Sequence, residues 1–289
     1  MAYLLGFDYG GTKVDIGLGT PDGEIVQQER VLVADHPTLT DLIDASLAVG
    51  MRMAEQETVS AVGVSTMGIT FPDRVELAPN VPGWSDLHLP EQFGRTFGAT
   101  PVAFENDVRA ACLAEMTWGS LAACDVGAYL NLGSGIAMAL VVDGHLHAGA
   151  HRAAGEIAYV WRSGEAGFAA GRAPFEEEFG GLGIDRTIRR TFPPLQSLHD
   201  VFADLNQPRH RLFFETTFRE IARRVGHVLL ALDVERVSVG GGIARRFPEF
   251  APLFEDEWQR HLPYPPHLVA SRFLDRAGLH GALALAARS

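Results

Sequence analysis

Residues 3–14 read YLLGFDYGGTKV and contain two strand patterns separated by a glycine turn. The run from Tyr3 to Phe7 is short and apolar, as expected of a buried strand, and a second apolar run resumes at Val14. Gly10 and Gly11 lie between the two runs, where the chain reverses. The segment therefore predicts two antiparallel strands, with Asp8 at the end of the first one.

The turn between these strands has the composition of a phosphate-binding loop. Glycines let the backbone approach a phosphate closely and direct N–H groups toward it. Thr12 adds a hydroxyl donor and Lys13 adds a positive charge. Asp8 can hold Mg²⁺ through a water molecule, since Mg²⁺ prefers oxygen ligands and keeps much of its hydration shell. The alternative is an ordinary Gly-Gly hairpin turn, because short glycine motifs recur by chance.

Two further glycine motifs follow strand patterns later in the chain. The turn Gly133-Ser134-Gly135 separates the apolar runs 127–132 and 136–142, which repeats the pattern of residues 3–19 and predicts a second, related α/β lobe. The run Gly240-Gly241-Gly242 follows the strand pattern 236–239, at the kind of edge where α/β folds bind ligands. A tight turn and a close strand-to-helix crossing are the respective alternatives.

A polar triplet, Glu105-Asn106-Asp107, ends the apolar strand pattern 102–104 and precedes a helix pattern over 108–118. The carboxylate of Asp107 can accept the proton of a substrate hydroxyl as its oxygen attacks a phosphoryl group. Asn106 beside it can orient that substrate. The alternative role of Asp107 is to cap the following helix.

Composition limits the classes of function. The chain has 289 residues, 47% of them hydrophobic and 21% charged, which is ordinary for a globular protein. Its formal net charge of -12 repels a polyanion, so we expect no nucleic-acid partner. The N-terminus does not resemble a secretory signal and no apolar run approaches the ~20 residues of a membrane span. We therefore expect a cytoplasmic protein with no membrane partner.

Taken in order, these motifs resemble those of the ROK family, named for repressors, open reading frames and kinases. Two more stretches fit the family's sugar pocket: Pro79-Asn80-Val81-Pro82-Gly83-Trp84 and Gly155-Glu156-Ile157-Ala158-Tyr159. The resemblance covers nearly the whole chain. It implies a two-lobed α/β fold of the sugar kinase/Hsp70/actin type (ribonuclease H-like), with a cleft between the lobes. We expect a small lobe over 1–107 plus 274–289 and a large lobe over 108–273.

The resemblance also implies a glucokinase-like activity, the ATP-dependent phosphorylation of a sugar hydroxyl, such as the 6-OH of glucose. It makes Asp107 the catalytic base and implies sugar, ATP and Mg²⁺ as small-molecule partners, and a homo-oligomer, either dimer or tetramer. The residues that it assigns to the sugar are Asn80, Asn106, Glu156, Tyr159 and Glu177. Those that it assigns to ATP and Mg²⁺ are Asp8, Gly10, Gly11, Thr12, Lys13, Gly133, Ser134, Gly135, Gly240, Gly241 and Gly242.

The chain departs from the family pattern at the sugar pocket. Tyr159 replaces the family's histidine, and the stretch 168–177 lacks every cysteine of the family's zinc segment. We therefore expect no structural zinc, because no closed set of ligands is left. Gly171 aligns Glu177 with the family's sugar-binding glutamate, while a slip of one residue selects Glu176 or Glu178. Acidic residues at a helix start are the alternative. Tyr159 either offers its hydroxyl to the sugar or fills the space left by the metal.

These departures leave other acceptors open. The first alternative is a kinase of an aminosugar, such as kanosamine, glucosamine or an N-acetylhexosamine, or of another polyol. The second is a sugar-responsive regulator without catalysis. Because the phosphate loop starts at Asp8, we expect no DNA-binding segment ahead of it, and the intact Asp107 favours catalysis.

Overall fold

The computed structural model describes residues 2–71, 74–76, 83–161, 171–274 and 276–289. The contacts between residues divide the chain into two compact units. Unit 1 contains residues 1–122, 148–153 and 276–289, and unit 2 contains residues 123–147 and 154–275.

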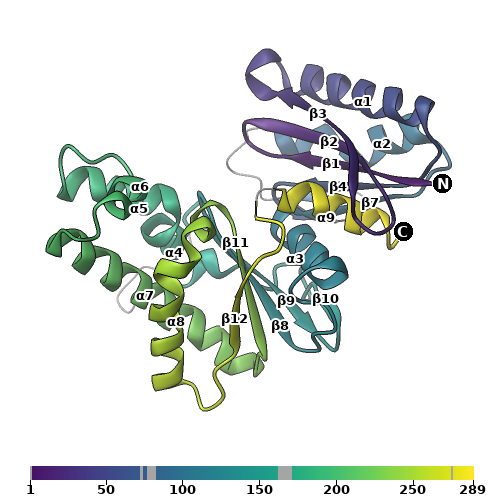
Figure 1. The fold of residues 1–289 in the computed structure, drawn as a ribbon. Coiled ribbons are helices and arrows are strands. Elements are labelled where there is room, and N and C mark those ends of the chain that lie inside the picture. The colour runs from purple at the N-terminus through teal and green to yellow at the C-terminus, as the bar shows by residue number, and fades with distance from the viewer. Residues whose placement is uncertain (1, 72–73, 77–82, 162–170, 275) are drawn as a thin grey trace. The chain divides into compact units, whose positions relative to one another are not determined.

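Unit 1 is built on a sheet with the strand order β3-β2-β1-β4-β7 (Figure 1). Strands β1 to β3 form an antiparallel meander, and β4 and β7 run parallel to β1. The strands are β1 (Tyr3–Tyr9), β2 (Lys13–Gly19), β3 (Ile25–Leu32), β4 (Val59–Thr66) and β7 (Val102–Asn106), with a separate pair β5 (Ile69–Thr70) and β6 (Val75–Glu76). The helices are α1 (Leu39–Gln56), α2 (Leu89–Phe97), α3 (Asp107–Trp118) and α9 (Ala277–Ala286), with short 3₁₀ turns at Val33–Asp35 and Trp84–Leu87.

Helices cover both faces of this sheet because successive strand residues point to opposite sides. Phe7 and Tyr9 of β1 pack on Phe93 of α2 and on Trp84. The hydroxyl of Tyr9 shares a hydrogen bond of 2.6 Å with Ser46 of α1. Asp8, which lies between Phe7 and Tyr9 in β1, therefore faces α9 on the opposite side of the sheet.

Small residues let α9 lie close to the sheet. A β-carbon on Gly6 would lie 3.2 Å from the Ala282 side chain, and one on Gly63 of β4 would lie 1.8 Å from the Ala282 backbone oxygen. Gly281 of α9 meets the backbone of Ala110 in α3 in the same way, at 2.5 Å. The last helix of the chain is thus packed onto the first strands and onto α3.

A methyl group at Gly63 should destabilise unit 1. Gly63→Ala places its β-carbon inside the van der Waals radius of a backbone oxygen, which cannot move without shifting α9. We expect the free energy of unfolding to fall by about 1–3 kcal/mol, measured by thermal unfolding.

The matched control is Gly94→Ala on α2, where nothing lies within 4 Å of the added carbon. Alanine is the better helix former there, so this variant should gain about 0.5–1 kcal/mol. Equal melting temperatures for the two variants would contradict the close packing of α9.

Unit 2 repeats the same arrangement with the order β10-β9-β8-β11-β12. Three antiparallel strands are again followed by two parallel ones, which confirms the two related lobes expected from the sequence. The strands are β8 (Gly127–Leu132), β9 (Ile136–Val142), β10 (His145–His147), β11 (Arg236–Gly240) and β12 (His267–Ala270). The helices are α4 (Pro174–Phe179), α5 (Gly181–Thr191), α6 (Leu198–Ala203), α7 (Pro208–Leu232) and α8 (Phe247–His261), with 3₁₀ turns at Ile157–Tyr159 and Gly242–Arg246.

The division by contacts differs from the lobe boundaries expected from the sequence. Helix α3 belongs to unit 1, although the expected large lobe began at residue 108, because α3 packs against α9. Residues 148–153 also belong to unit 1, while the segments on either side of them belong to unit 2. Across the described part of the chain, no helix is long and apolar enough to cross a membrane.

Candidate active site

The carboxyl ends of the parallel strands in unit 1 carry a row of polar side chains. In the register of the sheet, Asp15 is paired with Arg30 and with Asp8, Asp8 with Ser65, and Ser65 with Glu105. Residues paired in this way lie on one face of the sheet. The Ser65 hydroxyl donates to Asp8 at 3.0 Å. The edge at which α/β folds bind ligands is therefore polar across all five strands.

Asp8 lies against the first turn of α9. A β-carbon on Gly278 would lie 2.2 Å from Oδ2 of Asp8, so only glycine leaves room for the carboxylate. The pKa of Asp8 is raised to about 7, mainly by burial and also by the charges of Asp107 and Asp15, although the hydrogen bond from Ser65 lowers it. The influence of Asp107 means that the carboxyl groups predicted for Mg²⁺ and for catalysis are close in unit 1.

The turn after β1 leaves its backbone open. The N–H of Gly10 donates to the Lys13 carbonyl at 3.0 Å, which closes the turn. Gly11 is exposed, and a β-carbon there would meet nothing within 4 Å. Neither glycine has a positive φ, so backbone conformation does not demand glycine at these positions. The fold itself therefore does not require glycine at these positions, whereas a ligand that approaches the backbone closely would.

Lys13 is engaged within the sheet. Its Nζ lies 2.6 Å from Oδ2 of Asp15, and Arg30 binds the same carboxylate at 2.6 Å. The charge expected on the phosphates is therefore shared with Asp15 in this structure. Thr12, next to it, is exposed at the turn.

The polar triplet marks the passage from β7 into α3. The side-chain oxygen of Asn106 accepts the N–H of Arg109 at 2.7 Å, so the residue that caps the helix is Asn106. Asp107 is the exposed first residue of α3, and its Oδ1 accepts the N–H of Val108 at 2.9 Å. Capping thus accounts for Asn106 and leaves the carboxylate of Asp107 at the polar edge.

Unit 2 brings its two glycine motifs together. The carbonyls of Gly133 and Ser134 accept the first N–H groups of α5, from Gly181 at 2.9 Å and from Leu182 at 3.0 Å. Gly241, at φ 86°, crosses so close to the Gly133 turn that a β-carbon would lie 2.4 Å from the Leu132 oxygen. A β-carbon on Gly242 would meet nothing within 4 Å. The second and third motifs therefore form one glycine-rich edge.

Asn131 lies between these two motifs. Its side chain is 3.4 Å from the β-carbon position of Gly133 and 2.7 Å from that of Gly241. The sequence pattern did not point to Asn131, because a polar residue inside a strand pattern usually faces solvent.

Glu176 lies on the Gly135 turn, whereas Glu177 does not. Oε2 of Glu176 accepts the N–H of Ile136 at 3.1 Å and lies 2.1 Å from the β-carbon position of Gly135. Glu177 instead forms two hydrogen bonds of 2.7 Å with Arg172, which hold the pKa of its carboxyl below the usual range.

Tyr159 lies close to two carboxylates. Burial raises the pKa of its hydroxyl, and the charges of Glu156 and Glu176 raise it further. The phenol therefore keeps its proton at neutral pH and can donate a hydrogen bond. Glu156, Tyr159 and Glu176 form one cluster in unit 2.

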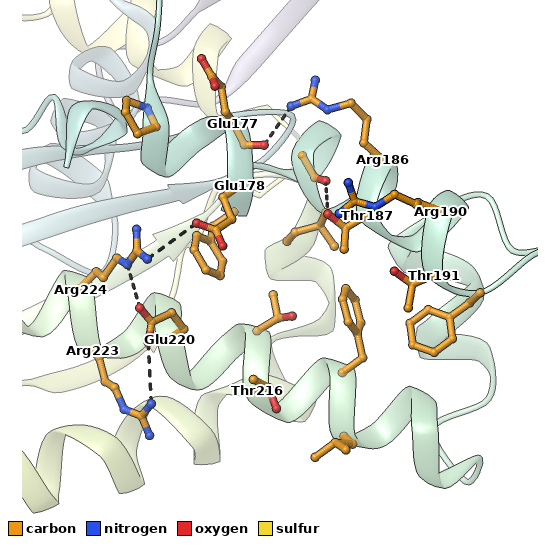
Figure 2. A pocket seen from close by; sticks show the side chains of 18 of the residues that line it. Glu177, Glu178, Arg186, Thr187, Arg190, Thr191, Thr216, Glu220, Arg223 and Arg224 are labelled. Atoms are coloured by element: carbon orange, nitrogen blue, oxygen red, sulfur yellow. Dashed lines mark hydrogen bonds and ion pairs between the residues drawn. The ribbon is translucent and has the colours of Figure 1, made fainter. Parts of the chain in front are cut away.

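A pocket of about 1480 Å³ adjoins this cluster in unit 2. Tyr159 and Glu177 line it, together with residues of α5 and α7. Figure 2 shows Arg224 of α7 between Glu178 of α4 and Glu220 of α7. The two ion pairs measure 3.7 Å and 2.9 Å. The predicted residues Tyr159 and Glu177 thus border a cavity, while the glycine turns do not contribute to its lining.

Two expectations fall on undescribed residues. Asn80 lies outside the described residues, as do residues 168–170 of the cysteine-free segment. Within the described ranges, no group of three or more histidine, cysteine, aspartate or glutamate side chains is arranged to hold a metal ion. The absence of structural zinc stays a prediction.

Two units with the same strand order, each with a glycine turn after its first strand, define the two-lobed fold of the sugar kinase/Hsp70/actin type. The chain belongs to the ROK family, whose sequence model matches residues 4–289. It is 26% identical to a beta-glucoside kinase of Listeria innocua, over 90% of this chain and 87% of that one. It is 28% identical to a kanosamine kinase of Amycolatopsis mediterranei, over 98% and 96%. The crystal structure of a ROK hexokinase from Thermus thermophilus matches with a TM-score of 0.85 at 24% identity, over 98% and 97%.

Proposed function

We propose that this protein is an ATP-dependent kinase that phosphorylates a hydroxyl group of a sugar, with Asp107 as the base. The observation that carries the proposal is that Asp107, whose charge acts on Asp8, lies at the polar edge of unit 1, beside the open turn of Gly10 and Gly11. The names of the two relatives, both kinases of sugar compounds, support the same class of reaction.

In the proposed reaction, the carboxylate of Asp107 accepts the proton of the acceptor hydroxyl. The freed oxygen attacks the γ-phosphorus of ATP in line, the bond to the β-phosphate oxygen breaks, and ADP leaves. Because this transfer needs little covalent help from protein, correct placement of the hydroxyl supplies most of the catalysis. The cap that Asn106 makes on α3 fixes the start of the helix that carries Asp107.

The residues of the polar edge fit ATP with Mg²⁺. The half-buried carboxylate of Asp8 is a hard oxygen donor, and the Gly11 position has no neighbour that a phosphate would displace. When bound, Mg²⁺ neutralises charge on the phosphate oxygens. In unit 1 the proposed phosphate donors are the backbone N–H groups of Gly11 and Thr12, while the N–H of Gly10 closes the turn. In unit 2 the resemblance assigns Gly133 to Gly135 and Gly240 to Gly242 to the nucleotide.

The sugar-binding residues are Glu156, Tyr159, Asn106 and Asn80, and Glu176 takes the role expected for Glu177. Glu176 is the glutamate of α4 that lies with Tyr159 and on the Gly135 turn, whereas Glu177 is held by Arg172. Tyr159, as a neutral phenol, donates to a sugar oxygen in place of the family's imidazole.

The acceptor class is inferred from the family resemblance and from the relatives. We propose the 6-OH of a hexose such as glucose, with an aminosugar as the alternative that the kanosamine kinase relative favours. An ADP-release assay over glucose, mannose, glucosamine, kanosamine, N-acetylhexosamines and inositols decides between them. Release that depends on one of these sugars supports the proposal. Sugar binding without ADP release would indicate a regulator.

Glutamine substitution distinguishes the two adjacent glutamates. Glu176→Gln removes the negative charge next to Tyr159 and weakens its hydrogen bond with the Gly135 turn, so we expect kcat/KM for the sugar to fall about 10- to 100-fold. Glu177→Gln is the matched control on the same helix and should stay close to wild type. The reverse order in steady-state kinetics would restore the assignment to Glu177.

A further inference from the structure

Residues 148–153 leave unit 2 and pack with unit 1. The segment turns twice through the left-handed region, at Gly149 with φ 75° and at Arg152 with φ 58°. Glycine adopts this conformation freely, but a residue with a β-carbon does so at an energetic cost. Such residues persist where surrounding contacts hold them, and they cluster at functional sites. The turn alone therefore does not explain why position 152 is an arginine.

The contacts of Arg152 supply that reason. Its Nη2 lies 2.8 Å from Oε2 of Glu105, and its Nε donates to the carbonyl of Thr70 on β5. Its own carbonyl accepts from Nη1 of Arg109 at 3.3 Å. The side chain thus ties the segment 148–153 to β5 and to the end of β7.

Glu105 transmits this contact to the triplet. Its carboxylate is buried, with 5% of the residue exposed, and is shared by Arg109 and Arg152 at 2.8 Å each. Its second oxygen accepts the backbone N–H of Asn106 at 3.0 Å. A buried carboxylate held by two guanidinium groups has little freedom to reorient. The ion pairs of Glu105 therefore hold the backbone at Asn106, the residue directly before Asp107.

We infer that Arg152 is a positioning residue for the proposed phosphoryl transfer, which acts through Glu105 on the orientation of Asn106 and Asp107. The inference rests on the proposed function. Arg109 also holds Glu105 from four residues along the chain, and its Nη1 reaches the Arg152 carbonyl, so a change at Arg109 would disturb α3 and the segment 148–153 together. Through the side chain of Arg152, the segment 148–153 holds Glu105, the residue directly before Asn106.

The variant Arg152→Gly tests this directly. Glycine accepts φ 58° more easily than arginine, so the turn itself is kept and only the side-chain contacts are lost. We expect kcat/KM for the sugar to fall about 10- to 100-fold, because small misplacements of a reacting group have effects of this size. KM for ATP should stay close to wild type, and the melting temperature should fall only slightly, because Arg109 still holds the Glu105 carboxylate. Arg152→Lys keeps a cation and should restore part of the activity, since lysine makes one contact where arginine makes two.

Asp233→Gly is the matched control, because Asp233 is also left-handed, with φ 52°, at the end of α7 in unit 2. It relieves the same backbone strain and should leave the kinetics unchanged. Wild-type kinetics in Arg152→Gly would overturn the inference. A large fall in its melting temperature with kcat and both KM values altered together would also overturn it, since that pattern marks a structural role.

Amide hydrogen exchange separates this inference from the proposed function. Loss of the Arg152 contact should speed exchange at the N–H of Asn106, which donates to Glu105, whether or not any sugar is phosphorylated. Unchanged exchange at Asn106 in Arg152→Gly would remove the positioning role. An inactive wild type with faster exchange in the variant would reject the proposed function alone.

Discussion

Asp107→Asn should lower kcat about 100- to 10,000-fold while the sugar still binds, because asparagine keeps the shape of the side chain but cannot accept the proton. The side chain is exposed and the helix cap is Asn106, so the fold should not depend on the carboxylate. Steady-state kinetics give kcat, and calorimetric titration gives the affinity for the sugar. The melting temperature should change little.

Asp41→Asn is the matched control for this variant. Asp41 is also an exposed acid in the first turn of a helix of unit 1, where it accepts from Thr38 at 2.7 Å. It should lose a similar amount of helix-dipole stabilisation, roughly 0.3–1 kcal/mol, without loss of turnover. Turnover of Asp107→Asn within a few-fold of Asp41→Asn would remove Asp107 from the role of base.

Asp8→Asn should make the protein more stable and less active. The pKa of Asp8 is raised to about 7 in the folded chain, from an ordinary value of 3.8. Between these values the unfolded carboxyl has lost its proton while the folded one keeps it, so stability falls as pH rises from about 4 to 7. Above that range the ionised Asp8 lowers the free energy of unfolding by about 1–3 kcal/mol, and asparagine removes this loss.

The gain in stability of Asp8→Asn should depend on pH. The melting temperature of the metal-free variant should exceed that of the wild type at pH 8, and the two should converge near pH 4. Activity should fall about 10- to 100-fold, the usual effect of removing a group that holds a metal through its water. A variant that is less stable than wild type at pH 8 would contradict the account of Asp8.

Asp15→Asn provides the contrast on the same face of the sheet. Burial opposes ionisation of Asp15, but hydrogen bonds from Arg30 and Lys13 outweigh it and hold the pKa of this carboxyl below its ordinary value. Its ionised form therefore stabilises the fold above pH 4, and asparagine should lower the melting temperature at pH 8. Opposite shifts for two neighbouring aspartates separate the ligand-binding carboxylate from the structural one.

Local pattern was enough to predict the two meanders and the glycine turns, whereas the type of fold came from the resemblance to the ROK family. The apolar runs around Gly10 and Gly133 predicted two meanders, and both sheets contain them. The signal is strong because strand periodicity and glycine turns depend on neighbouring residues. The polar triplet was predicted for the same reason, since a strand pattern ends where Glu105 begins.

Contacts between distant residues could not be predicted. Arg152 meets Glu105 from 47 positions away, and no pattern in the sequence links them.

The choice between neighbouring glutamates could not be predicted for a different reason. One residue along a helix is a rotation of about 100°, so a slip of one position decides whether Glu176 or Glu177 lies on the Gly135 turn. Arg30 shares the Asp15 carboxylate with Lys13 because β3 pairs with β2 and places Arg30 opposite Asp15.

The most direct test of the central claim is ³¹P NMR of the protein with ATP, Mg²⁺ and each sugar of the panel. We expect a new phosphomonoester resonance that grows with one sugar as the γ-phosphate signal of ATP declines, and that is absent with Asp107→Asn. Conversion of ATP to inorganic phosphate alone, or no loss of ATP with any sugar of the panel, would contradict it.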